Sequence, residues 1–506
     1  MTTAKASSAI PYGFNGRLVT VEGDLCRGLP ALNIVGMANR TIDESKDRIR
    51  SAIRNSGFTF PREKVVINLA PAELKKIGTS LDLPIAMVIL AISGQLLQKD
   101  LSNKLFVGEL SLNGTLRPVR GIINIIECAR EHQIKQIYIP AANAAQASLV
   151  ARDIQIIPID SLQELWQSLK QIITISPLER CVKNTQKDKH RHYYLDEIYG
   201  QFQAKRAMVI AVAGHHNILL SGPPGTGKTM LAKTVPDLLP ELNYDEQISV
   251  TKLHSLGTDI QDIIRTRPFR SPHHTASLSA IIGGGSAAVP GEISLAHLGV
   301  LCLDELPEYP SRILESLRQP LEDHQVTISR NAIKVTYPAD FMLVGTMNPC
   351  PCGYLGSKTH ACTCSGNQLQ AYRKKLSGPV LDRIDLTVAM TPVPQSQIFK
   401  NTTFSTREHT TATTQIATAI ANQHVRYGQP EIYNASLSSA EIQKFLHISA
   451  SAKNFLSTAA TKLNLSVRAY FKVIKVAQTI ADIESSPEIT ISHLSEALQY
   501  RQTVAD

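Results

Sequence analysis

Eight consecutive residues, 222 to 229, form the chemically most specific segment of this 506-residue sequence. They read Gly-Pro-Pro-Gly-Thr-Gly-Lys-Thr and match the G-x-x-x-x-G-K-[ST] pattern of loops that bind nucleotide phosphates. Glycines in such a loop let backbone N–H groups face the phosphate oxygens. An apolar run before the loop and a helical pattern after it supply the strand and helix that the motif requires, so a plain Gly/Pro-rich turn is the weaker interpretation. The predicted nucleotide-binding residues are Gly222, Pro223, Pro224, Gly225, Thr226, Gly227, Lys228 and Thr229.

Three polar residues that follow two later apolar runs complete the predicted chemistry. Asp304 and Glu305 end the run Gly-Val-Leu-Cys-Leu from 299 to 303, where a strand cap would explain one acid but not the pair. Lys228 is expected to reach the β- and γ-phosphates, and Thr229 and Asp304 to hold Mg²⁺. Glu305 suits the polarisation of an attacking water. Asn348, which ends the run from 341 to 347, is positioned to hold the same water from the other side.

Four of the eight cysteines lie within fifteen residues, with a spacing that suits a metal ion. They form two C-x-C pairs, and four thiolates are a common ligand set for tetrahedral Zn²⁺. Incidental reduced thiols are the alternative, because the C-x-C spacing is tighter than the usual C-x₂-C. The predicted zinc ligands are Cys350, Cys352, Cys362 and Cys364.

Length and composition indicate several domains of a globular protein with no membrane span. A chain of this length is expected to form two to four domains. The formal charge of +9 is a weak pointer to a polyanionic partner. The first ten residues do not resemble a signal peptide, and the longest apolar run, from 81 to 97, is interrupted by Asp82, Pro84 and Gly94. A cytoplasmic location is therefore expected.

Hydrophobic periodicity divides the chain into two α/β regions, one all-α region and one linker. Residues 1–175 and 195–395 alternate β-branched runs with helical patterns, and both are predicted to be α/β. Residues 176–194 are polar and without periodicity, which predicts a linker. Residues 405–506 show helical spacing only and predict an all-α domain, although the Thr-rich segment 402–414 is expected to be a loop. In the first region, strands are predicted near 17–21, 65–69, 105–107 and 136–139.

The order of the three nucleotide motifs resembles that of the AAA+ ATPases, and the match is closest to the ComM/YifB family within the magnesium-chelatase-like group. The resemblance covers essentially the whole chain. It rests on the segments 200–201, 269–277, 290–297, 348–353, 377–385 and 465–470. It implies a P-loop AAA+ core of α/β class, an all-α C-terminal lid and a Lon-protease-like (ribosomal S5 domain 2-like) N-terminal domain.

The resemblance also implies a homo-hexameric ring with each ATP at a subunit boundary. Arg383 falls where related proteins carry the arginine finger, and Arg468 falls at the second sensor in the helical lid. A planar guanidinium suits charge that develops on a γ-phosphate. Considered without the family motif, Arg383 would be expected to form a surface ion pair with Asp382 or Asp385.

ComM-type proteins resemble motors that drive branch migration of DNA during natural transformation, which implies single-stranded or branched DNA and recombination proteins as partners. Arg330 and Lys334 lie in a segment with the composition of a hairpin that would face a central pore. His273 and His274 lie where the family has an insert. Contacts of these four residues with DNA phosphates would not depend on base sequence, whereas a solvated loop is the alternative. A chelatase-type remodeller that drives a partner enzyme is the second functional hypothesis, because a fold does not fix a function.

The N-terminal region resembles a protease fold without its full catalytic pair. Residues 76–80 look like the turn that bears the serine, Ser80, while Ile125 stands at the place of the catalytic lysine. A serine without its base is a poor nucleophile. No peptidase activity is expected.

Overall fold

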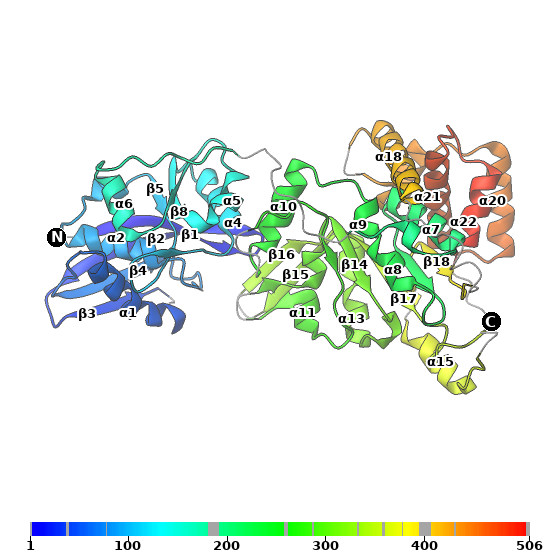
Figure 1. The fold of residues 1–506 in the computed structure, drawn as a ribbon, viewed down its shortest axis with the longest axis horizontal. Helices are drawn as coiled ribbons and strands as arrows, with labels where there is room; N and C mark the ends of the chain where they lie inside the picture. Colours follow the sequence, from blue (N-terminus) through cyan, green and yellow to red (C-terminus); the bar gives the residue numbers. More distant parts are fainter. Residues whose placement is uncertain are drawn as a thin grey trace.

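Three regions follow one another along the long axis of the molecule in the computed structural model (Figure 1). The structure describes residues 3–36, 40–76, 78–180, 192–257, 262–285, 288–330, 333–356, 360–376, 378–393, 406–429 and 432–501. Most of the predicted linker, residues 181–191, lies outside this part of the chain.

The first region is a seven-stranded mixed sheet with the strand order β3-β4-β2-β1-β5-β8-β9. β1 and β2 form a long antiparallel hairpin, β4 pairs antiparallel with β2, and the remaining pairs are parallel. All four predicted strands are confirmed. The strands are β1 (Ala4–Tyr12), β2 (Asn15–Cys26), β3 (Ala31–Val35), β4 (Lys64–Ala70), β5 (Lys104–Phe106), β8 (Gln136–Pro140) and β9 (Gln155–Ile159), with the two-residue pair β6 (Glu109–Leu110) and β7 (Leu116–Arg117).

The helices of the first region pack against this sheet through their buried apolar residues. α2 is the most deeply placed, with ten of its eleven residues buried, as expected for a helix that is apolar all round. The helices are α1 (Arg40–Asn55), α2 (Asp82–Ile92), α3 (Gln98–Leu101), α4 (Ile122–Glu131), α5 (Ala144–Ser148) and α6 (Leu162–Leu169).

The second region is built on a five-stranded, all-parallel sheet with the order β11-β14-β17-β10-β18. Parallel strands all end at one edge, where α/β proteins bind their ligands. The phosphate loop follows β10, Asp304 follows β14 and Asn348 follows β17, so the sheet brings the three motifs to that edge. The strands are β10 (Ile218–Ser221), β11 (Phe269–Arg270), β14 (Gly299–Leu303), β17 (Phe341–Met347) and β18 (Leu386–Ala389).

Helices and two small hairpins surround this second sheet. The predicted hairpin is confirmed: β15 (Gln325–Arg330) pairs antiparallel with β16 (Ile333–Pro338). A second hairpin joins β12 (Gly283–Gly284) to β13 (Val289–Pro290). The helices are α7 (Phe202–Gly214), α8 (Lys228–Lys233), α9 (Val235–Leu238), α10 (Tyr244–His254), α11 (Leu278–Ile282), α12 (Glu292–Leu295), α13 (Ser311–Ser316), α14 (Arg318–Asp323), α15 (Gly366–Lys375) and α16 (Gly378–Leu381).

The third region, residues 406–429 and 432–501, contains helices and no strand among its described residues. The prediction of a loop across the Thr-rich segment 402–414 is wrong from residue 407 onwards, where α18 begins. The reason is tertiary: Ala412 is buried against the core, and Asp196 accepts hydrogen bonds from the backbone N–H groups of Glu408 and His409. The helices are α18 (Arg407–Tyr427), α19 (Ser439–Phe445), α20 (Ala450–Lys462), α21 (Val467–Ile483) and α22 (Ile491–Gln499).

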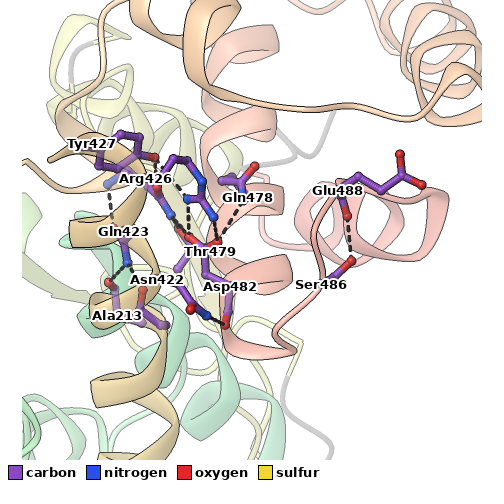
Figure 2. Close-up of polar contacts among 12 residues, drawn as sticks. Ala213, Asn422, Gln423, Arg426, Tyr427, Gln478, Thr479, Asp482, Ser486 and Glu488 are labelled. Atoms are coloured by element: carbon purple, nitrogen blue, oxygen red, sulfur yellow. Dashed lines mark hydrogen bonds and ion pairs between the residues drawn. The ribbon is translucent and has the colours of Figure 1, made fainter.

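A buried polar network fixes the third, helical region to the second region (Figure 2). The Asp482 carboxylate of α21, which is fully buried, accepts hydrogen bonds from both terminal nitrogens of Arg426 on α18 and from Gln478 at 2.9 Å. Gln423 of α18 donates to the carbonyl of Ala213 in α7 at 2.8 Å. A buried carboxylate is tolerated only when it is satisfied in this way, so the network specifies how α18, α21 and α7 pack.

Candidate nucleotide-binding and hydrolysis site

The phosphate loop connects β10 to α8 in the conformation that its glycines permit. Gly225 and Gly227 have φ values of 77° and 89°, which residues with a Cβ adopt only with strain. Gly222 passes so close to β18 that a Cβ there would lie 2.4 Å from the carbonyl oxygen of Met390. Lys228 Nζ donates to the carbonyls of Gly222 and Pro223 at 2.6 and 2.9 Å. The ammonium is therefore held inside the loop, where burial lowers its pKa against the opposing charges of nearby acids.

The two acids predicted from the sequence lie beside the loop, and a threonine that the sequence reading missed organises them. Thr229 Oγ1 donates to Asp304 Oδ2 at 3.1 Å, so the two predicted magnesium ligands are in contact. The fully buried Thr346 donates its hydroxyl to Asp304 Oδ1 and accepts the backbone N–H of Glu305 at 3.1 Å. Glu305 has a φ of 55°, and about half of its side chain is exposed. Thr346 thus fixes one acid by its side chain and the other by its backbone.

Asn348 reaches the loop directly: its Oδ1 accepts a hydrogen bond from Lys228 Nζ at 3.2 Å. Its backbone is hydrogen-bonded to the hydroxyl of Tyr372, a buried residue of α15. Three predicted elements of the site, the loop, the acid pair and the amide, therefore meet at one edge of the sheet. A γ-phosphate that entered the loop would meet the Lys228 ammonium with Asn348 beside it.

His273 and His274 lie at this edge as well. His274 Nδ1 is 4.0 Å from Glu305 Oε2, and the rings of the two histidines are 4.1 Å apart, centroid to centroid. The structure thus places a predicted DNA contact next to the predicted catalytic acid. Contact of these histidines with DNA stays a prediction. The sequence did not indicate that His274 lies near Glu305, because these two residues are 31 positions apart.

Arg383 lies at the opposite end of the parallel strands, before their first residues and not after their last. It precedes β18, which pairs in parallel with β10 from Ile218 opposite Leu386 to Ser221 opposite Ala389. Asn217, the residue before β10, donates its side-chain N–H to the Arg383 carbonyl at 2.9 Å. The phosphate loop follows the far end of β10, and the four-residue strand alone spans about 10 Å. Arg383 is consequently anchored away from the phosphate loop of its own chain.

Arg468 joins Arg383 there. Glu322 of α14 accepts from Arg383 at 2.5 Å and from Arg468 at 2.7 Å through a single carboxylate oxygen. The cavity around the two guanidinium groups has a volume of about 520 Å³, and none of its described lining residues belongs to the phosphate loop. The two arginines predicted to complete the site are thus brought together, but not with Lys228.

The four cysteines predicted to bind zinc converge after β17. Their sulfur atoms all lie within 4.8 Å of one another, with Cys350 Sγ 3.3 Å from Cys352 Sγ and 3.8 Å from Cys362 Sγ. Backbone N–H groups point at the sulfurs, as in the contact from Cys352 N to Cys364 Sγ at 3.4 Å. The N–H groups of Tyr354 and Thr363 lower the pKa of the Cys352 thiol to about 5. Backbone N–H groups also favour the thiolates of Cys362 and Cys364, but desolvation and the neighbouring thiols raise the pKa of both. This donor set fits a tetrahedral zinc ion, whose ligands must be thiolates.

The cysteine cluster is also close to the phosphate loop. Gly353 has a φ of 84°, and a Cβ on it would lie 2.9 Å from Pro224 Cδ. Cys350, which is fully buried, is two residues after Asn348. The fold of the cluster therefore helps to set the position of Asn348.

The hairpin of β15 and β16 presents Lys334 to solvent, while the side chain of Arg330 lies outside the described part of the chain. Midway along its length, where Val335 pairs with Ile328, the hairpin meets the first region: a Cβ on Gly13 would lie 2.9 Å from Val335 Cβ. In that region Ile125 is fully buried in α4. Lys76 Nζ, four residues before Ser80, donates to three backbone carbonyls, and burial lowers its pKa. The expectation of no peptidase activity stays a prediction.

The five-stranded parallel sheet, its phosphate loop and the acid pair define the class: the fold is that of a magnesium-chelatase-like AAA+ ATPase. Family models agree along most of the chain. Residues 194–398 match the model described as magnesium chelatase, subunit ChlI, residues 21–143 match subunit ChlI of Mg-chelatase, and residues 406–501 match the C-terminal part of subunit ChlI.

Full-length relatives narrow the class to a family. The chain is 42% identical to the uncharacterized protein YifB of Escherichia coli, over 97% of this chain and 95% of that protein. It is 41% identical to the competence protein ComM of Haemophilus influenzae, over 100% of this chain and 98% of that protein. The chain belongs to the ComM/YifB family. None of the helices in the described residues is both long and apolar enough to span a membrane.

Proposed function

We propose that this protein hydrolyses ATP at a composite site and uses the energy to move DNA strands. The observation that carries the composite site is the position of Arg383 and Arg468 at the edge of the sheet opposite the phosphate loop. A guanidinium that cannot reach its own nucleotide can serve the nucleotide of an adjacent copy. A closed ring of copies, a homo-hexamer in this family, gives every site such a neighbour.

Each residue of the proposed site has a separate role in ATP hydrolysis. Lys228 neutralises phosphate charge, Glu305 orients and polarises the attacking water, and Asn348 holds that water from the other side. Mg²⁺, for which Thr229 and Asp304 would be ligands, supplies further charge neutralisation at the phosphates. Arg383 and Arg468 of one copy would stabilise the charge that develops in the site of the next copy.

DNA as the substrate of the motor is supported by the ComM relative and its name as a competence protein. We propose ATP-driven branch migration that helps incoming single strands to integrate in natural transformation, in the cytoplasm and alongside recombination proteins. The β15–β16 hairpin, with exposed Lys334 and with Arg330 at its end, is the element that would contact DNA phosphates in the pore. Such contacts would weaken as salt rises.

A chelatase-type remodeller is the second candidate, because the family models are those of magnesium-chelatase subunits. The 38 kDa magnesium-chelatase subunit of Rhodobacter capsulatus, however, is 26% identical over only 30% of this chain. ATP hydrolysis that DNA does not change would favour the remodeller.

The composite site is tested by mixing two variants that are each inactive alone. Arg383→Ala should bind ATP without hydrolysing it, because the next copy's site loses its arginine. Glu305→Gln should also bind ATP without hydrolysing it, because its own site loses the carboxylate that polarises the water. In mixed rings, an intact site of the Arg383→Ala copy can face the intact arginines of a Glu305→Gln copy, so ATP turnover should return. No recovery, in rings shown by mass to contain both copies, would contradict an arginine that acts between copies.

A further inference from the structure

Glu322 lies where the nucleotide core and the helical lid meet. Its carboxylate accepts from Arg383, which precedes β18, and from Arg468, which is in the first turn of α21. Both arginines lower the pKa of Glu322, so the group is ionised at neutral pH. One carboxylate therefore holds two like-charged groups from different parts of the fold side by side, against their mutual repulsion.

The hydrogen bonds leave most donors of both guanidinium groups available. Each arginine uses only its NH2 nitrogen for Glu322, and Arg383 uses NH1 for the carbonyl of Pro379. Arg383 Nε is buried, with no partner among the described residues, in a side chain that is 10% exposed. An atom shielded in this way is out of reach of an outside acceptor, so the donors available to a ligand are the remaining hydrogens of the terminal nitrogens. A phosphate oxygen has the charge and geometry to accept hydrogen bonds from guanidinium N–H groups.

The surrounding cavity carries charges of both signs. Lys472 and Lys475 of α21 line it with the two arginines, and four carboxylates line it as well, those of Glu322, Asp340, Asp382 and Asp385. Asp340 pairs with His324 at 2.8 Å, and Asp385 lies 4.0 Å from Lys472, whereas Glu322 is the carboxylate that contacts both guanidinium groups. The attraction for an anion is therefore local to the two guanidinium groups, which share one negative charge.

We propose that Glu322 is a positioning residue, which pairs Arg383 with Arg468 so that their free N–H groups reach the terminal phosphate of a nucleotide in a second copy of this chain. The inference rests on the proposed composite site. It adds Glu322 to that site as a residue that touches neither the nucleotide nor the attacking water and that acts only through the two arginines. It also predicts that the two guanidinium groups act as one unit, with Glu322 retained in the active ring.

The test uses the full chain with Glu322→Gln, which keeps the shape of the side chain and loses its charge. Its own phosphate loop is intact, so the Kd for ATP should stay within about twofold of that of the wild type, while kcat should fall about tenfold, as expected for a lost charge-assisted contact in the transition state. Glu322→Asp should recover part of the loss. The matched control is Glu315→Gln, which removes an exposed carboxylate of α13 that pairs with Arg318 at 2.7 Å and should leave kcat unchanged.

Mixing distinguishes positioning from a general loss of structure. Glu322→Gln copies have a good hydrolysis site and a misplaced arginine pair, whereas Glu305→Gln copies have the reverse. The mixture should therefore turn over ATP faster than either variant alone. A kcat for Glu322→Gln equal to that of the wild type would overturn the inference, as would a fall in kcat that mixing does not restore.

The outcome for Arg383→Ala separates this inference from the proposed function. If Arg383→Ala is inactive and Glu322→Gln is fully active, only the role of Glu322 is refuted. If Arg383→Ala hydrolyses ATP as the wild type does, the composite site itself is refuted.

Discussion

Replacing Thr346 by Val removes a single hydroxyl from the buried centre of the hydrolysis site and keeps the shape of the side chain. That hydroxyl donates to Asp304 and accepts the backbone N–H of Glu305. Thr346 is fully buried, so water cannot readily replace either contact. In Thr346→Val, Asp304 loses one donor and Glu305 loses the contact that fixes its backbone.

The expected loss follows from the type of contact. A hydrogen bond to a charged group is worth about 1.5–3 kcal/mol, and about 1.4 kcal/mol corresponds to tenfold in rate. If the transition state needs Glu305 and Asp304 where Thr346 holds them, kcat for ATP hydrolysis should fall by about 10- to 150-fold. The phosphate loop does not depend on Thr346, so the Kd for ATP should change by less than about threefold.

Steady-state ATP hydrolysis and direct nucleotide binding give the two numbers. Thr346→Ser is the matched control, because it keeps the hydroxyl and loses a methyl group, and it should retain most of the activity. A folded Thr346→Val protein with a kcat within twofold of that of the wild type would refute the reasoning. So would an equal loss in Thr346→Ser, which would indicate packing instead of the hydrogen bonds.

Three further predictions concern stability, metal and the first region. Arg426→Ala should lower the free energy of unfolding by about 3–5 kcal/mol in urea titrations, because it leaves the buried Asp482 carboxylate without its cation; a loss below about 1 kcal/mol would show that the network does not hold the lid. Protein purified without added metal should contain about one zinc per chain, and Cys350→Ser should lower this ratio and reduce ATP turnover through Asn348; a ratio near zero in the wild type would exclude the metal. Purified protein should not cleave casein with or without ATP, and cleavage that Ser80→Ala abolishes would contradict the absence of a base beside that serine.

The residues proposed to touch nucleotide could be assigned from the sequence, because local motifs encode them. Lys228, Asp304 and Asn348 each follow an apolar run, and parallel strands must end at a common edge. Thr346 and Glu322 could not be found in this way. Thr346 occupies an ordinary position within a strand, and Glu322 lies 61 residues before Arg383 and 146 before Arg468. Their partners are fixed only by tertiary packing.

The loop expected across 402–414 is wrong from residue 407 onwards for a related reason. Thr has a low helix propensity, but the hydroxyls of Thr410, Thr411 and Thr414 donate to the carbonyls four residues earlier, while Ala412 packs into the core. Composition describes the exposed side of this helix and not its buried side. Tertiary contacts decided the conformation.

The central claim, a motor that uses ATP to move DNA strands, is tested most directly on a three-stranded branched DNA with a labelled strand. The wild type should displace that strand only when ATP and Mg²⁺ are present, and Lys228→Ala, which loses the ammonium of the phosphate loop, should displace none. ATP hydrolysis by the wild type that no DNA alters, together with no displacement of the strand, would contradict the account.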